Sequence, residues 1–199
     1  LGDAALFAEP FGRTAVNRES HSPERPSVTP NAHAWESPRG WALSLALIST
    51  VAVAARVAYV LWVLGPVRSG LDAIWYQLQG GSILAGTGYV VPTSLFEGEL
   101  TPTAAFPPVY PAYQALWQWM FGPGATAVRM AGVVPGVVTV VLVAILGRAL
   151  ADARVGLLAA GAVALSPTLV AADSSTMSEN LTVPLVLAAL VLAHRVLTK

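Results

Sequence analysis

Four apolar segments of this chain are each long enough to cross a lipid bilayer as a helix. The first, residues 41–64, contains one charged residue, Arg56, and is followed by Gly65 and Pro66. At 1.5 Å per residue, a helix over this segment would measure about 36 Å, more than the roughly 30 Å of the hydrocarbon core. The other three cover residues 125–146, 155–172 and 181–197. The pattern predicts an all-α integral membrane protein with about four transmembrane helices.

The segment between the first two of these helices, residues 65–124, is more mixed in polarity. From Asp72 to Leu84, apolar side chains recur near helical spacing before a Gly-Thr-Gly stretch, which predicts a short amphipathic helix on the membrane surface. Residues 107–121 are apolar but too few to cross, which favours an interfacial or re-entrant helix. We therefore expect a large loop that contains short helices of its own.

Residues 1–40 show no apolar period and hold five prolines among Ser, Arg, Glu and His. This composition predicts a disordered tail, and its layout is not that of a signal peptide. The chain begins at Leu1 and ends at Lys199, directly after an apolar segment. We therefore expect residues 41–199 to be the N-terminal part of a longer transmembrane domain.

Composition agrees with a membrane protein and excludes several kinds of site. Hydrophobic residues make up 55% of the chain and charged residues 11%, with a mean hydropathy of +0.62, whereas soluble domains carry about 25% charged residues. The net charge is zero and no basic patch stands out, so nucleic-acid binding has no support. The absence of cysteine excludes disulfides and thiolate metal sites, and the three histidines are scattered. Ten of the eleven basic residues are Arg, which is typical of a GC-rich bacterial source.

The distribution of basic residues predicts the orientation in the membrane. Cytoplasmic loops carry an excess of Arg and Lys. If residues 107–121 do not cross, eight basic residues lie on one side and two, Arg68 and Arg129, on the other. If they do cross, the counts become six and four. The charge bias thus favours four spans in a bacterial plasma membrane, with the N-terminus cytoplasmic and residues 65–124 and 173–180 facing outward together.

Four charged residues are candidates for chemistry, each with a structural alternative. Asp72 lies just beyond the first span, where it could act as a catalyst or cap a helix. Arg129 could bind a lipid phosphate or extend to the headgroups as interfacial arginines do. Arg56, within the first span, could bind substrate or pair with a neighbouring helix. Glu179 could serve a site, or belong to a helix start that Ser178 caps.

The order of several short motifs resembles the first half of a known superfamily. The resemblance covers roughly residues 41–199 and lies in Leu71–Gln77, Gly86–Tyr89, Phe106–Pro111, Phe121–Gly122, Val128–Ala131, Gly147–Arg148, Arg154–Ala160, Ala164–Pro167 and Met177–Glu179. In this order, the motifs look like the C-type membrane glycosyltransferases that use polyprenyl-phosphate sugars. That superfamily includes protein O-mannosyltransferases, lipid A aminoarabinose transferases and actinobacterial homologues.

The resemblance implies transfer of a sugar, such as mannose or arabinose, from a lipid phosphate to a glycan, lipid or protein acceptor on the outer face. Asp72 would be the general base, and Arg129, with Arg56 second, would stabilise the leaving phosphate. Glu179 would orient the acceptor. The same motifs supply the other two expected substrate-binding residues, Tyr76 and Tyr110.

The resemblance also bears on metals. Some members carry an acidic pair in the first outward loop, but Ala73 follows Asp72 here, so we expect no required metal. Two other classes stay open, a transporter and a non-catalytic membrane scaffold. Transporters bind near the membrane midplane and carry internal repeats, and this sequence shows no repeat.

Overall fold

The structure is a computed structural model that describes residues 37–64, 70–94 and 98–198. These residues belong to one compact unit, residues 33–199. The described residues form helices joined by loops, with one isolated β-bridge between Val90 and Pro102. The predicted all-α class is therefore confirmed for the part of the chain that the structure describes.

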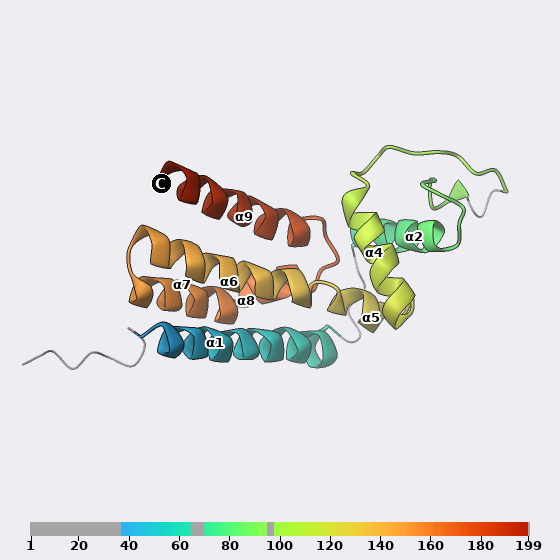
Figure 1. Ribbon diagram of the computed structural model, residues 1–199. Coiled ribbons are helices and arrows are strands. Elements are labelled where there is room, and N and C mark those ends of the chain that lie inside the picture. Colours follow the sequence, from blue (N-terminus) through green and yellow to red (C-terminus); the bar gives the residue numbers. More distant parts are fainter. Residues whose placement is uncertain (1–36, 65–69, 95–97, 199) are drawn as a thin grey trace, which may run out of the picture. The chain divides into compact units, whose positions relative to one another are not determined.

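Three long apolar helical segments are candidate membrane spans (Figure 1). The first is α1 (Pro38–Ala58), which continues into a π-helical turn, η2 (Tyr59–Val63). The second joins α5 (Ala125–Met130) to α6 (Val133–Leu150), and the third is α9 (Glu179–Leu197). All three coincide with predicted spans.

The remaining predicted span is bent. In place of one helix over residues 155–172, the structure has α7 (Ala153–Leu165) and α8 (Pro167–Asp173), which meet at 63°. Pro167 has no backbone N–H and disfavours helical geometry in Ser166, whose ψ is 115°. The described residues thus contain three candidate spans, or four if the bent pair is one span, and the predicted count of four stays a prediction.

The first helix begins earlier than the apolar pattern predicted. The Ser37 side chain accepts a hydrogen bond of 3.0 Å from the backbone N–H of Gly40, and Pro38 occupies the first helical position. Both are strong helix-start signals. The prediction of a disordered tail over residues 1–40 is therefore wrong for residues 38–40, which are helical, and the rest of that tail, residues 1–36, lies outside the described residues.

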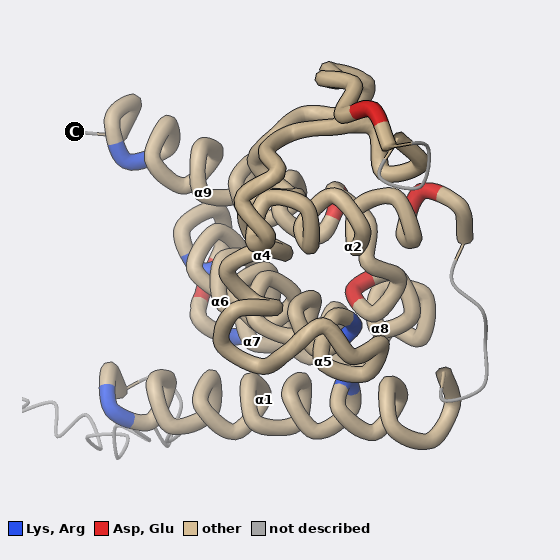
Figure 2. The backbone as a smooth tube through the Cα atoms, turned by 90° about the vertical axis from the view of Figure 1, so that its right-hand side faces the viewer, with Lys and Arg blue, Asp and Glu red and all other residues tan. Residues whose placement is uncertain are grey.

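Small side chains form the contact between α1, α6 and α7. Ala52, Ala144 and Ala160 are fully buried there. Large apolar side chains point outward instead, such as Leu43 of α1, which is 71% exposed. Figure 2 shows how few charged residues interrupt these helices. Close packing through small residues, with large apolar ones outside, is the arrangement that lipid-embedded helices use.

Two shorter helices, α2 (Leu71–Leu84) and α4 (Val109–Phe121), pack against each other. Their contact is made by Gly80 of α2 and by Gln114 and Gln118 of α4, all of them buried. At 1.5 Å per residue, α4 measures about 20 Å, which is too short to cross a bilayer. The length agrees with the prediction that this segment does not cross, while its position at the membrane surface stays a prediction.

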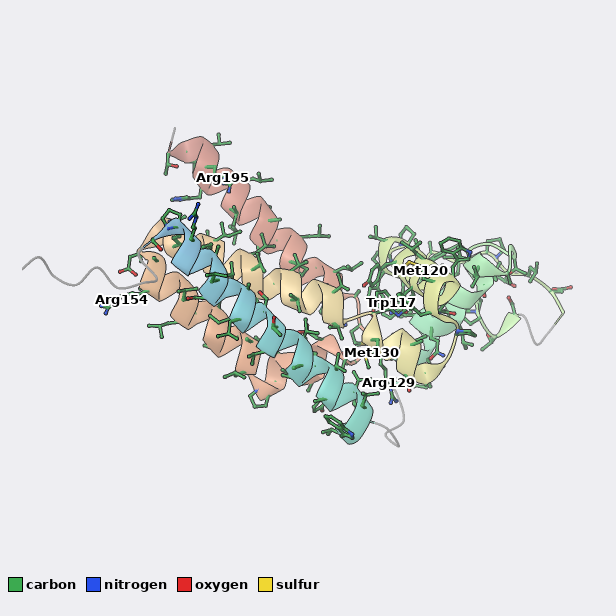
Figure 3. The ribbon with its side chains drawn as sticks, turned by 60° about the horizontal axis from the view of Figure 1, so that its bottom comes forward. Trp117, Met120, Arg129, Met130, Arg154 and Arg195 are labelled. Carbon is green, nitrogen blue, oxygen red and sulfur yellow. The ribbon has the colours of Figure 1, made fainter. Side chains whose placement is uncertain are left out.

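The basic residues of the helical segments lie toward different ends. Figure 3 shows Arg154 and Arg195 near one end of the long helices and Arg129 near the other, beside Met130. The predicted topology assigns these two ends to opposite sides of the membrane, and that assignment stays a prediction.

Candidate functional site

Asp72 lies in the first turn of α2, exposed to solvent. The residue that caps this helix is Gly70, and no side chain makes a capping hydrogen bond there. The alternative that Asp72 is the helix cap is therefore wrong. Its carboxylate is still favourably placed, because the N-terminal end of a helix carries partial positive charge.

A cavity of about 530 Å³ opens beside Asp72. Its far wall is formed by Ser175 and Met177, which lie about a hundred residues later in the loop between α8 and α9. Gly70, Leu71 and Ala73 complete the described lining, in which Asp72 is the one charged residue. The cavity thus offers one carboxylate, one hydroxyl and a partly apolar wall, which suits a neutral group carrying hydroxyls better than an anion.

Tyr76 connects α2 to the same loop. Its side chain is 4% exposed, and its hydroxyl donates a hydrogen bond of 3.2 Å to Oγ of Ser178. Oγ of Ser178 in turn lies 3.4 Å from a carboxylate oxygen of Glu179, a long and weak contact. The structure therefore links two predicted site residues, Tyr76 and Glu179, through Ser178, for which the sequence predicts only a role as a helix cap. Ser178 precedes α9, but its side chain makes no capping hydrogen bond there.

Arg56 is completely buried and pairs with Asp173 at the end of α8. Nε and Nη2 of Arg56 lie 2.8 and 2.7 Å from the same carboxylate oxygen, Oδ2. Nη1 of Arg56 also donates to the backbone oxygen of Ala52 at 3.2 Å. A buried arginine needs such a partner, since an unpaired charge in an apolar environment is very costly. Arg56 thus pairs with a neighbouring helix, which was the structural alternative for this residue. Substrate binding by Arg56 stays a prediction.

Gly132, which caps α6, and Gly136 within α6 leave room for this ion pair. A Cβ atom on Gly136 would collide with the carboxylate of Asp173 and with Nε of Arg56, and one on Gly132 would collide with the backbone oxygen of Asp173. The same oxygen accepts a hydrogen bond of 2.8 Å from Nδ2 of Asn180. The position of Asp173, where the loop between α8 and α9 begins, is therefore fixed from three helices.

Arg129 is 8% exposed and lies in the last turn of α5, where it contacts the end of the segment formed by α1 and η2. Its Nη1 donates a hydrogen bond of 2.7 Å to the backbone oxygen of Leu64. Arginine often serves the last carbonyl groups of a helix in this way. The contact anchors α5 to η2, and the predicted contact of Arg129 with a lipid phosphate stays a prediction.

Tyr110 is 3% exposed and packs edge-on against Tyr76, with 4.9 Å between ring centroids. Its hydroxyl accepts a hydrogen bond of 2.9 Å from Nε2 of Gln114. Burial raises the pKa of Tyr110 well above its ordinary value. The phenol therefore stays protonated at physiological pH and does not act as a base. A role of Tyr110 in substrate binding stays a prediction.

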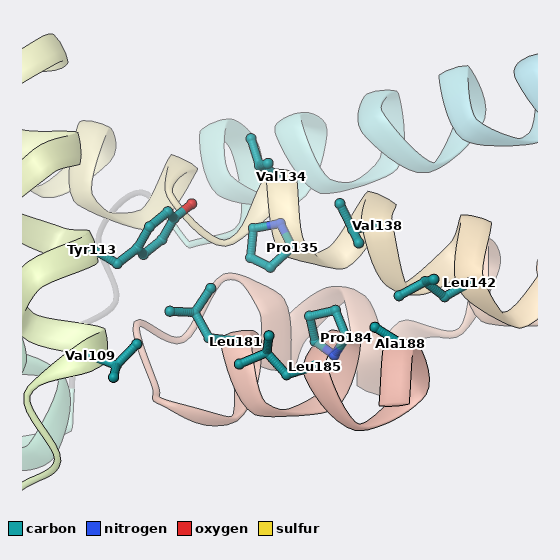
Figure 4. A pocket seen from close by; sticks show the side chains of 10 residues that line it. All are labelled: Val109, Tyr113, Val134, Pro135, Val138, Leu142, Leu181, Pro184, Leu185 and Ala188. Carbon is teal, nitrogen blue, oxygen red and sulfur yellow. The ribbon is translucent and has the colours of Figure 1, made fainter. Parts of the chain in front are cut away.

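A second cavity, of about 530 Å³, lies between α6 and α9 and is lined almost wholly by apolar side chains (Figure 4). Pro135 and Pro184 face it from the two helices, and Tyr113 of α4 lies at one end. Pro135 cannot donate to the backbone oxygen of Ala131 four residues earlier, and the Tyr113 hydroxyl donates to that oxygen instead. The cavity between α6 and α9, called the groove below, therefore has very little polar surface.

Comparison with known proteins bears on the second half of the chain. Residues 105–199 match the family model of the dolichyl-phosphate-mannose-protein mannosyltransferases. No curated protein and no solved structure matches the chain. Together with the apolar helices, the match supports a membrane glycosyltransferase. It includes α4 and the loop with Ser175 and Met177, whereas Asp72 lies outside it.

Several residues around the site were not identified as functional from the sequence. Asp173 was placed on the outward side but given no role, although a buried arginine in a span calls for a carboxylate partner. Asn180 and the glycines at 132 and 136 gave no comparable signal. Their importance depends on contacts between helices that are distant in the sequence.

Proposed function

We propose that this protein transfers a sugar, such as mannose or arabinose, from a polyprenyl-phosphate donor to an acceptor on the outer face of a bacterial plasma membrane. The observation that carries the proposal is the cavity shared by Asp72 and the loop residues Ser175 and Met177. The loop falls within the matched family region, and Asp72 contributes a carboxylate from outside it. Two independent parts of the chain thus meet at one cavity.

In the proposed reaction, Asp72 is the general base. It takes the proton of an acceptor hydroxyl as that oxygen attacks the anomeric carbon of the donor sugar. The bond from the anomeric carbon to the phosphate oxygen breaks, and the lipid phosphate leaves with the electron pair. We propose Arg129 as the contact that stabilises this developing charge, with Arg56 second, and Glu179 as a group that orients the acceptor.

We also propose that the lipid chain of the donor lies along the groove between α6 and α9. Leu181, which lines this groove, follows Glu179, a proposed site residue, by two residues in the sequence. From Leu181 to Ala188 it extends about 10 Å along α9, most of one leaflet of the hydrocarbon core. An apolar chain held there would place its phosphate at the outer surface.

Substitution of Asp72 tests the reaction. In membranes containing the full-length protein, transfer of label from polyprenyl-phosphate [14C]mannose should fall about 100-fold or more in Asp72→Asn, the loss expected for a general base. Asp152→Asn is the matched control, because Asn keeps the cap that Asp152 provides for α7. We expect EDTA to leave transfer unchanged. Full transfer by Asp72→Asn would overturn its assignment, and no transfer from mannosyl or arabinosyl donors by the unaltered protein would favour a scaffold.

The groove is tested by filling it. Ala188→Phe should raise the KM for the donor at least about 10-fold while kcat changes little, because it removes binding that is equal in ground and transition states. Leu192→Phe, at a position that is 60% exposed and outside the lining, is the control. An unchanged donor KM in Ala188→Phe would exclude this groove as the site of the chain.

A further inference from the structure

Thr176 has a backbone conformation that threonine rarely adopts. Its φ is 60°, and it is the one non-glycine residue with positive φ in the part of the chain that the structure describes. A β-branched side chain is crowded in this left-handed region, where glycine and asparagine are usual. The Thr176 side chain is also buried, with 3% of its surface exposed. Such a conformation persists only where the surroundings impose it.

The surroundings of Thr176 fix both ends of its loop, residues 174–178. At the start, Asp173 is held by Arg56 and Asn180, and Oγ of Ser174 donates to the backbone oxygen of Val170 at 3.0 Å. At the end, Ser178 accepts the hydrogen bond from Tyr76 of α2. The strained residue therefore lies in the middle of a short segment that is tied to three helices.

Both residues that flank Thr176, Ser175 and Met177, line the Asp72 cavity. Ser175 and Met177 form its wall opposite α2, and the left-handed turn at Thr176 sets the direction of both. The unfavourable backbone conformation thus lies at Thr176, between the two residues that form the cavity wall facing the Asp72 carboxylate. Glycine would form this turn without strain, but it would also allow the loop many other conformations.

We infer that Thr176 is a positioning residue of the Asp72 site. Its buried side chain locks the left-handed turn, and the turn holds Ser175 and Met177 at a fixed separation from Asp72. Thr176 itself acts through these two neighbours. The inference rests on the proposed function for its catalytic consequence, whereas its structural part can be measured without any transfer assay.

The structural part is tested with a spin label in the full-length protein. These 199 residues contain no cysteine, so Ser175→Cys gives a labelling site on an exposed loop residue, with any cysteine elsewhere in the full-length chain replaced first. Thr176→Gly should make this label more mobile, seen as a narrower EPR spectrum, while Thr176→Val, which keeps the branched shape, should leave it unchanged. A label at Leu192→Cys on α9 is the control and should not respond to either substitution. An unchanged spectrum at position 175 in Thr176→Gly would overturn the inference.

The catalytic part is tested by titrating polyprenyl-phosphate mannose in membrane vesicles with the endogenous acceptor. Thr176→Gly should lower kcat about 10-fold or more at an unchanged donor KM, because small misplacements of groups that orient a substrate are costly. Thr176→Val should restore kcat to near the unaltered value. An unchanged kcat in Thr176→Gly would overturn the positioning role. A mobile label together with no transfer by the unaltered protein would instead contradict the proposed function and leave the loop's dependence on Thr176 intact.

Discussion

The ion pair between Arg56 and Asp173 shows how single residues fix the start of the loop between α8 and α9. A charge in a span is costly alone, and here two opposite charges meet from α1 and α8 with Gly136 of α6 directly beside them. The pair also fixes the residue from which the loop facing Asp72 begins. Buried ion pairs add little stability over apolar packing, but breaking one leaves an uncompensated charge. The role of this pair is therefore better described as placement than as stabilisation.

Gly136→Ala should separate the charges of this pair. The new methyl group would occupy the space of the Asp173 carboxylate and of Nε of Arg56, neither of which can move far while fully or largely buried. We expect the free energy of unfolding to fall by about 3 kcal/mol, the lower end of the cost of breaking a buried pair. Equilibrium unfolding in mixed SDS micelles measures this change.

Gly161→Ala of α7 is the matched control, because nothing lies within 4 Å of the added Cβ atom. Alanine favours a helix over glycine by roughly 0.5–1 kcal/mol, so this variant should be slightly more stable than the unaltered protein. Equal stability of Gly136→Ala and Gly161→Ala would contradict the view that Gly136 makes room for the pair.

The residues of the site could be predicted from the sequence only in part. Residue type alone left Asp72 open between a helix cap and a catalyst, and only the resemblance of its motif to a known superfamily favoured the catalyst, which stays a prediction. The Asp173 partner of Arg56 was within reach of reasoning about charge in a membrane. Thr176 could not be predicted, because its proposed role depends on a positive φ angle that threonine rarely adopts.

At the scale of elements, the pairing of α2 with α4 carries Asp72 to its position. The buried face of α2 consists of small and polar residues and Tyr76, while Leu71 and Ile74 are exposed. Gln79 and Gln118 bury their amides by hydrogen bonds to backbone oxygens of Val90 and Gln77. In a water-soluble helix pair, apolar side chains are buried and polar ones exposed. Here polar side chains are buried and apolar ones exposed, as expected for a pair whose outer surface meets lipid.

The adjacent glycines of α2 give a direct test of this pairing. A Cβ atom on Gly80 would lie 2.8 Å from Nε2 of Gln118 and 3.1 Å from the backbone nitrogen of Ala115, whereas one on Gly81 would have an ordinary contact of 3.7 Å with Gln118. Gly80→Ala should therefore push α4 away from α2 and lower the apparent melting temperature by several degrees, since overpacking costs about 1–3 kcal/mol. Gly81→Ala should match or exceed the unaltered protein, because alanine is the better helix former.

Near-ultraviolet circular dichroism is a suitable readout for this pair, because Trp75 and Trp117 lie on the two helices. A melting temperature of Gly80→Ala equal to that of Gly81→Ala would show that α2 and α4 do not depend on the close approach at Gly80.

Helix positions were predictable to within a few residues, because a long apolar segment can cross a membrane in few conformations other than a helix. The bend at Ser166 and Pro167 was also encoded locally, although the apolar pattern alone runs through it unbroken. The packing of α2 on α4 was not predictable, since it depends on glutamines and a glycine whose spacing is unremarkable in the sequence.

For the whole molecule, the decisive question is whether α7 and α8 together cross the membrane. If they do, the α8–α9 loop faces the same side as the α2–α4 segment, and the cavity shared by Asp72 and Ser175 lies outside. If the 63° bend instead marks a re-entrant hairpin, α7 and α8 enter and leave by one side, and the ends of this bent pair lie together. The contact of Tyr76 with Ser178 favours the first arrangement, because it joins the two segments directly.

Single cysteines at three exposed or half-buried positions distinguish these arrangements, since these residues contain no native cysteine to interfere. With four spans, Thr93→Cys and Ser175→Cys should react with a membrane-impermeant maleimide added outside intact cells, and Ala153→Cys only after the membrane is opened. A re-entrant bent pair would give Ala153→Cys and Ser175→Cys the same accessibility. That result would contradict the four-span topology. If Ala153 were also outside, the orientation predicted from the basic residues would be reversed, because Arg148 and Arg154 flank the turn that contains Ala153. Labelling of Thr93→Cys and Ser175→Cys from outside, with Ala153→Cys protected, would place the cavity and the large loop on one face, as an outward-facing transferase requires.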